Sequence, residues 1–169
     1  CFQLTSITLP SGLTTIESGT FDLCKSLTTI DIPDSVAAIA DDAFIGCKAL
    51  QSFTLSPNHP YFFLADDALC RTADSTLLLY PNARENRTYR IPDGITAISA
   101  YAFYDCDLLE SVVVPDSVTQ LPARAFSGCS ALASVSLPDS LTEIGTAAFS
   151  GCSALTGIRI PAAITEIIN

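Results

Sequence analysis

Residues 132–154 read LASVSLPDSLTEIGTAAFSGCSA, and Leu155 begins the same 23-residue pattern again. Leucine, proline, phenylalanine and cysteine all recur at this interval through most of the chain. The recurring cysteines and phenylalanines are Cys1, Cys24, Cys47, Cys106, Cys129 and Cys152, with Phe21, Phe44, Phe103, Phe126 and Phe149. A period shared by several residue types predicts a solenoid, in which each coil buries its apolar side chains against its neighbours.

Each coil divides into three sides. Val135-Ser-Leu137 alternates apolar and polar residues, which is typical of a half-buried strand, and Pro138 ends it because proline has no N–H for a continuing ladder. Leu141 and Ile144 are an apolar pair three residues apart, and they predict that the coil has a second side, which is short and either extended or turn-like. The apolar spacing from Ala148 to Leu155 predicts a short helical or 3₁₀ corner. We therefore expect an α/β leucine-rich repeat solenoid with one parallel strand per coil, stacked about 4.8 Å apart.

Residues 56–90 interrupt the period. Leu50 and Leu109 are 59 residues apart, which equals one 23-residue coil and one longer coil of 36. Apolar runs at 61–64, 68–70 and 77–80, with polar residues at 71–76, predict an inserted β-hairpin. We expect one solenoid over residues 1–169, with regular repeats at 1–55 and 91–169. Both ends fall inside a repeat, so we expect a fragment of a longer protein.

Composition narrows the possible partners. The chain carries a net charge of −10, whereas nucleic-acid binding depends on clustered lysine and arginine. The same charge disfavours docking on anionic lipid. No apolar run approaches the roughly 20 residues of a membrane span, so we expect no membrane insertion within this segment. We also expect the chain to be monomeric.

The repeat resembles a known family. Leu27-Thr-Thr-Ile30-Asp-Ile32-Pro33, followed by Ala43-Phe44-Ile-Gly-Cys47, is similar to the leucine-rich repeats of BspA-like surface proteins of bacteria and protozoa. The resemblance covers about residues 1–55 and 88–169, and the segment between them resembles the longer coil that such proteins insert. It implies an exported or cell-surface protein, extracellular in location, that binds host matrix, mucosal or bacterial partners.

The cysteines and aspartates that recur in successive coils could bind a metal ion or form disulfides instead of serving only the structure. Zinc ligands must converge on one point, whereas these cysteines lie one coil apart. Disulfides are harder to exclude, because the Cα atoms of stacked cysteines lie within the separation that a disulfide allows. Parallel side chains, however, hold the Cβ atoms too far apart for a disulfide. We therefore expect reduced, buried thiols. Asp93, Asp116 and Asp139 follow the strand-ending prolines of successive coils. They could bridge a calcium ion or serve as solvated turn residues, and we expect no metal or cofactor.

Catalysis has little support in this sequence. His59 is the one histidine, and it lies between Asn58 and Pro60 with no nucleophile at a recognisable spacing. No phosphate-cradling glycine loop, nucleophile elbow or His-Glu-x-x-His motif is present. We therefore expect a protein that is not an enzyme.

The outward side of the strands is the candidate binding face. Its side chains are small, rich in hydroxyl groups and lightly charged, and the candidate residues are Ser111, Val113, Ser134, Ser136, Arg159, Thr54 and Asp31. The aromatics of the insert, Tyr61, Phe62, Phe63 and Tyr80, could supply binding anchors or a local core. We expect a binding or adhesion module that recognises a protein or glycan ligand through this face. The alternative is a spacer that projects another domain.

Overall fold

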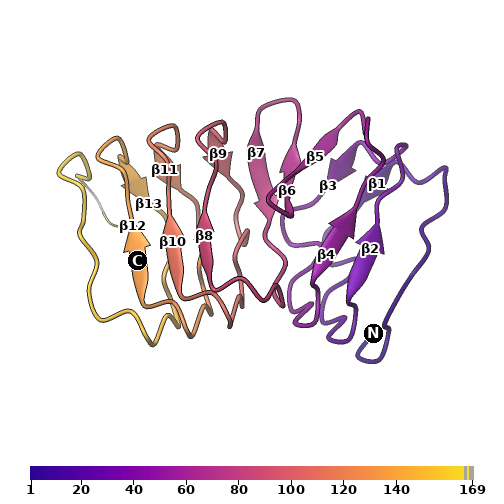
Figure 1. Ribbon diagram of the computed structural model, residues 1–169, viewed down its shortest axis with the longest axis horizontal. Helices are drawn as coiled ribbons and strands as arrows, with labels where there is room; N and C mark the ends of the chain where they lie inside the picture. Colours follow the sequence, from indigo (N-terminus) through magenta and orange to yellow (C-terminus); the bar gives the residue numbers. More distant parts are fainter. Residues whose placement is uncertain (166, 168–169) are drawn as a thin grey trace.

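A computed structural model describes residues 1–165 and 167, so residues 166, 168 and 169 of the last expected repeat lie outside the described part. The chain winds into an elongated stack of coils, with the sequence running steadily from one end to the other (Figure 1). The strands of successive coils pair in parallel, which confirms the predicted solenoid of parallel strands.

The first side of the coils carries three-residue strands. They are β2 (Thr29–Asp31), β4 (Ser52–Thr54), β8 (Thr88–Arg90), β10 (Ser111–Val113) and β12 (Ser134–Ser136). Strand β2 pairs with β4, and β8, β10 and β12 form a second group, each residue aligned with the one 23 positions away. The middle residue of these strands faces the core, as alternation predicts.

The second side of the coils also consists of strands. These two-residue strands are β1 (Thr15–Ile16), β3 (Ala38–Ile39), β9 (Ala97–Ile98), β11 (Gln120–Leu121) and β13 (Glu143–Ile144). Strand β1 pairs with β3 and β11 with β13, all in parallel. The coil is therefore flattened between two rows of strands, and the apolar core lies between them.

The expected helical or 3₁₀ corners are wrong, because the described residues contain no helix. Corner N–H groups alternate between the next coil and their own turn: Phe103 N donates to Ala125 O at 2.9 Å, whereas Cys106 N donates to Phe103 O at 3.2 Å, so no continuous run of helical hydrogen bonds forms. Residues of positive φ also interrupt the corners, such as Gly128 at 81°. The fold is therefore a β-solenoid rather than an α/β one. No helix in the described part could span a membrane.

The insert is confirmed and is larger than one hairpin. Strands β5 (Phe62–Ala65), β6 (Ala68–Arg71) and β7 (Thr76–Leu79) pair antiparallel in that order, and β7 then pairs in parallel with β9. In Figure 1 these strands stand between the two groups of regular coils.

Strands β6 and β7 separate two apolar cores. Leu77 belongs to the core of the C-terminal coils, whereas Leu78 belongs to the core of the N-terminal coils. In the same way Cys70 faces one core and Leu69 the other. Burial on both faces explains why the insert has continuous apolar runs instead of alternation.

A stack of aromatic rings follows the corners. The ring centroids of Phe103 and Phe126 are 4.8 Å apart, and those of Phe126 and Phe149 are 5.5 Å apart. Tyr80 of the longer coil takes the same position, with its centroid 5.4 Å from that of Phe103. Such offset ring contacts add to the area that each coil buries against the next.

Candidate functional site

The parallel register places one outward column of side chains along the C-terminal coils. Arg90 of β8 aligns with Val113 of β10, which aligns with Ser136 of β12. Arg159 lies 23 residues further, in the next coil. The column therefore has an arginine at each end and two small side chains between them.

A second column, of aspartates, lies just beyond the strand ends. Asp93, Asp116 and Asp139 each follow a proline that closes the strand. The turns that carry them are tied to one another: Ser117 Oγ donates to Asp93 O at 3.0 Å, and Ser140 Oγ donates to Asp116 O at 2.8 Å. These bonds fix the backbone from which the carboxylates project.

The two columns meet through ion pairs at their ends. An Arg90 guanidinium nitrogen lies 3.2 Å from Asp93 Oδ1, and an Arg159 nitrogen lies 2.9 Å from Asp139 Oδ1. Among the residues described, Asp116 has no ion-pair partner. The two pairs are exposed, so each contributes little to stability. Together the five groups leave one uncompensated negative charge, at the centre.

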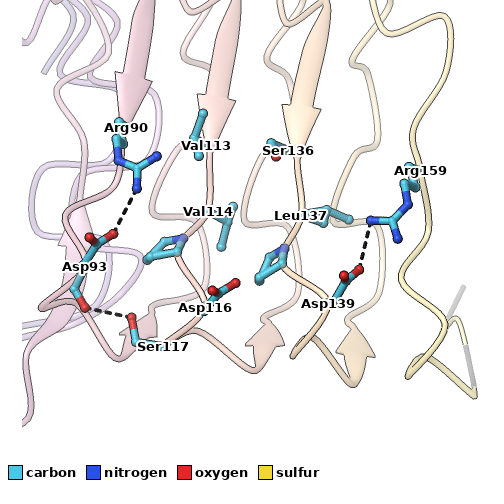
Figure 2. A pocket seen from close by; sticks show the side chains of 12 residues that line it. Arg90, Asp93, Val113, Val114, Asp116, Ser117, Ser136, Leu137, Asp139 and Arg159 are labelled. Carbon is cyan, nitrogen blue, oxygen red and sulfur yellow. Dashed lines mark hydrogen bonds and ion pairs between the residues drawn. The ribbon is translucent and has the colours of Figure 1, made fainter.

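These residues surround an open hollow of about 570 Å³ (Figure 2). The strand-end residues Val114, Pro115, Leu137 and Pro138 border it but are themselves buried, so most of the surface exposed in the hollow is polar. The side chains of Arg90, Asp116 and Arg159 lie around it, as Figure 2 shows. Seven of its twelve lining residues are polar or charged, so the hollow offers a ligand mainly hydrogen bonds and ion pairs.

The structure brings together only part of the predicted binding face. Val113, Ser136 and Arg159 line the hollow. Ser111 and Ser134 lie on the same strands outside the lining, joined by an Oγ–Oγ hydrogen bond of 2.9 Å.

Thr54 and Asp31 lie on the N-terminal pair β2–β4, where Thr54 Oγ1 donates to Asp31 Oδ1 at 2.7 Å. They are not among the residues that line the hollow. Arg90 also lines the hollow but is not among the residues predicted for the binding face. The signal was available, because Arg90 and Arg159 share one position in the 23-residue period.

The calcium alternative finds no converging ligands. Within the described ranges, no three histidine, cysteine, aspartate or glutamate side chains are grouped so that they could hold a metal ion. The outer two carboxylates of the aspartate ladder face guanidinium groups instead. The ladder is therefore a set of separate charges rather than a cage.

The cysteines are free thiols, six of them buried and Cys1 exposed. Buried ladder thiols donate to corner carbonyls of the preceding coil, as Cys152 Sγ does to Phe126 O at 3.1 Å. Burial raises the pKa of Cys47 and of Cys70 to about 12, so both are neutral at physiological pH. Neutral thiols are poor nucleophiles, and these groups therefore serve packing.

His59 is buried and holds the insert in place. Its Nδ1 accepts hydrogen bonds from the N–H groups of Tyr61 and Phe62, at 3.3 and 3.2 Å, which leaves Nε2 to donate to Pro33 O at 3.0 Å. Both ring nitrogens are thus engaged by backbone. Of the four insert aromatics, Phe62 and Tyr80 are core residues, Phe63 is half-buried and Tyr61 is exposed.

Comparison with known proteins gives the same architecture. The model of the BspA type leucine rich repeat region matches six copies, over residues 1–64 and 80–169. A leucine rich cell surface protein from Faecalibacterium prausnitzii A2-165 is 32% identical, with a TM-score of 0.81, covering 96% of this chain and 49% of that one. No protein of curated function matches the chain.

Two further crystal structures share the fold. The pneumococcal vaccine antigen PcpA is 20% identical with a TM-score of 0.85, over 96% of this chain and 46% of that one, and this likeness concerns the fold alone. A leucine-rich repeat protein from Bacteroides ovatus ATCC 8483 is 25% identical with a TM-score of 0.59, over 98% and 48%. The chain spans less than half of each of these three proteins. By its repeats, it belongs to the BspA-type leucine-rich repeat family.

Proposed function

We propose that the chain is a non-catalytic binding module of an exported or cell-surface protein, and that it recognises a protein or glycan partner from host matrix, mucosa or a bacterial surface. The observation that carries this proposal is the open hollow at the ends of β8, β10 and β12, which five charged side chains and two serines from successive coils surround. The neighbouring cell-surface protein of Faecalibacterium prausnitzii supports the location at the surface.

The face beside the hollow suits close approach by a ligand. Ser134 and Ser136 are exposed, and Ser111 is half-buried. Small hydroxyl side chains let another molecule reach the strand surface and form hydrogen bonds there. Charged and hydroxyl side chains line the hollow itself, and polar groups of this kind are found at the rims of protein interfaces.

We further propose that residues 1–169 act as one monomeric solenoid within a longer protein. The support is the packing at β6 and β7, whose opposite faces are buried in the two cores. Light scattering after size-exclusion chromatography measures the mass directly. A dimer would contradict this part of the proposal.

The function is tested by blocking the face. The purified chain is exposed to arrays of extracellular-matrix proteins, mucins, bacterial-surface extracts and glycans, and each ligand found is measured again with the variant Ser134→Arg,Ser136→Arg. We expect the arginines to abolish binding because they fill the approach to the hollow. The control is Gln120→Arg, at an exposed position of β11 on the second row of strands.

Ligands that bind both variants equally would contradict a role for this face. If no component of the arrays binds, the alternative of a spacer that projects another domain replaces the proposal.

A further inference from the structure

We propose that the outer edge of strand β5 binds an extended, apolar segment of a partner protein, which adds one strand to the sheet of the insert. This surface lies apart from the hollow at β8, β10 and β12, and the two share no lining residue. The inference therefore goes beyond the proposed function. It follows from the position of β5 in its sheet, its free backbone groups and a second hollow beside it.

Strand β5 is the last strand of its sheet, whose order is β9, β7, β6 and β5 (Figure 1). It pairs with β6 on one side, and within the described part of the chain no strand pairs with its other side. Proteins commonly protect such an edge with a charge, a proline or a bulge, because it otherwise attracts another strand. Residues 61–65 contain neither a charge nor a proline, and their register with β6 is continuous. The edge is therefore open to pairing.

The alternation of an antiparallel pair shows which backbone groups of β5 are free. Thr72 N donates to Tyr61 O at 2.9 Å, so Tyr61 and every second residue after it bond to the neighbouring strand. The N–H and the carbonyl of Leu64 lie between those positions and point away from β6, and no group in the described residues bonds to either of them. Phe62 faces the same way, but its N–H already donates to His59 Nδ1 at 3.2 Å. The edge thus offers a free donor at Leu64 and free carbonyls at Phe62 and Leu64.

An open hollow of about 480 Å³, here called the β5 hollow, lies beside this edge. Its apolar lining includes Leu55 and Pro57, which follow β4, and Phe63 and Leu64 of β5. Pro57 and Leu64 are exposed and the other two are half-buried, so the β5 hollow presents hydrocarbon to solvent. A ligand side chain beside Leu64 covers this surface, which favours an apolar residue there.

The backbone groups and the β5 hollow together select an extended peptide. In β-strand addition the main-chain hydrogen bonds supply affinity, and pockets for alternate side chains supply specificity. A helix does not fit, because its backbone groups bond within the helix. A sugar ring presents hydroxyl groups where the β5 hollow presents hydrocarbon. The preferred partner is therefore an extended segment with an apolar residue opposite Leu64.

The edge is fixed before a ligand arrives. His59 holds the start of β5, as described above, and Tyr89 Oη donates to Ala65 O at 2.8 Å at its end. The turn that follows is tied down as well, because an Arg84 nitrogen lies 3.0 Å from Asp67 Oδ2. Little backbone ordering remains to be done on binding, which favours affinity.

The test uses three synthetic peptides. The first, called the valine peptide, is acetyl-Thr-Val-Thr-Val-Thr-amide. The second has the same side chains but N-methyl groups on its three central residues, which remove the N–H donors of both edges. The third has serine in place of both valines, so it keeps the backbone and lacks the apolar side chains.

Hydrogen exchange at the Leu64 amide, followed by NMR, reports pairing at the edge. We expect this amide to exchange freely in the chain alone and about tenfold more slowly with saturating valine peptide. The N-methylated peptide should leave the exchange rate unchanged, and the serine peptide should bind more weakly. Unchanged exchange with the valine peptide, or equal slowing by the N-methylated one, would overturn the proposal. Equal binding of the serine peptide would overturn the role of the β5 hollow.

Two substitutions at Leu64 separate the backbone from the side chain. Leu64→Pro removes the free N–H without removing a bond to β6, and it should weaken binding of the valine peptide about tenfold. Leu64→Lys keeps the N–H and places a charge beside the β5 hollow, which should also weaken binding. Leu108→Lys is the matched control, because Leu108 is 40% exposed against 36% for Leu64 and lies outside the β5 hollow.

Unfolding curves establish which of these variants fold. If the proline variant does not fold, Leu64→Lys and the N-methylated peptide decide the question. Full-strength binding by Leu64→Lys, or an equal loss in Leu108→Lys, would contradict the inference.

This test can fail separately from the proposed function. The variant Ser134→Arg,Ser136→Arg should bind the valine peptide at full strength, because neither serine lines the β5 hollow. Loss of peptide binding in that variant would place the peptide on the other face and overturn the inference. Slow exchange at Leu64 that depends on protein concentration, without any peptide, would assign the edge to a second copy of the chain and overturn the assignment to a partner protein.

Discussion

Cys129 Sγ donates a hydrogen bond to the backbone carbonyl of Phe103, in the preceding coil, at 2.9 Å. Cys47 makes the same contact with Phe21 O at 3.1 Å. The repeated cysteine therefore joins the corner of one coil to the corner of the coil before it. A thiol suits this place because it is compact, apolar enough to be buried and able to donate a weak hydrogen bond.

Cys129→Ala should destabilise the solenoid by about 1–2 kcal/mol, because it removes a buried sulfur atom and leaves the Phe103 carbonyl without that donor. The measurement is the free energy of unfolding in urea. Cys1→Ala is the control, since Cys1 is exposed and its removal should leave the unfolding curve in place. An equal effect of the two substitutions would show that the buried thiol contributes nothing specific.

The folded chain should react with a thiol reagent at one position. Only Cys1 is exposed, and the thiolate is the reactive form of cysteine. Burial raises the pKa of Cys47 and of Cys70 from the ordinary 9.0 to about 12, so neither carries a thiolate at pH 8. We expect one fast-reacting group in buffer and seven in denaturant. Rapid labelling of several thiols in the folded chain would contradict the buried ladder.

The same pKa shifts predict a loss of stability in alkali. A thiol with a raised pKa in the folded state favours folding while it stays protonated, so this contribution is complete below pH 9 and is lost as the pH rises from 9 towards 12. Unfolding midpoints measured between pH 7 and 11 should therefore fall at the alkaline end. Replacing Cys70 with alanine should make the unfolding midpoint fall less steeply with pH. If the midpoint falls as steeply as before, groups other than Cys70 cause the loss of stability in alkali.

His59→Ala should loosen the insert. The substitution leaves the N–H groups of Tyr61 and Phe62 and the carbonyl of Pro33 without their partner, and unsatisfied buried groups cost about 1–3 kcal/mol each. We expect faster amide hydrogen exchange at residues 61–62 and a lower unfolding free energy. Asn58→Ala is the control because Asn58 is exposed beside it. Unchanged exchange at these amides would show that the ring does not hold the segment.

Gly145→Ala should destabilise the chain by about 1–3 kcal/mol, the usual cost of overpacking. A Cβ at this position would lie 2.6 Å from the backbone nitrogen of Ala123 and 2.8 Å from the carbonyl carbon of Pro122, so two coils would have to separate. Gly94→Ala is the matched control, because a Cβ there would meet no atom within 4 Å. The melting temperatures of the two variants are compared by thermal unfolding. Equal melting temperatures would contradict the close packing at Gly145.

The 23-residue repeat predicted well where the strands lie and which residues of successive coils are neighbours. Val112 and Val135 are aligned neighbours in the parallel sheet because their positions in the 23-residue pattern are the same. The pattern did not predict the corners. The Ala148–Leu155 spacing matches a helical turn, but only some corner N–H groups bond within their own turn, as Cys152 N does to Phe149 O at 3.2 Å. Others bond to the next coil, as Phe126 N does to Ala148 O at 2.9 Å. Side-chain spacing reports which residues are buried, and it does not show where the backbone groups bond.

The binding site was predicted in part. Val113, Ser136 and Arg159 were identified as outward residues, and the structure places them at the hollow. Thr54 and Asp31 share the same strand positions but lie on β2–β4, outside the hollow's lining. Strand position alone cannot separate these cases, because the hollow also depends on the turns and side chains of several adjacent coils.

The sequence alone determined the coil length, the place of the insert and the residues that stack, because a repeated apolar pattern is buried best when equivalent positions lie in contact. Only the tertiary structure decided that the corners are turns joined between coils and that β6 and β7 separate two cores. It also decided that Asp116 is left uncompensated between Arg90–Asp93 and Arg159–Asp139. These features depend on which donor, acceptor or charge lies nearest in space, and that is set by the packing of one coil on the next.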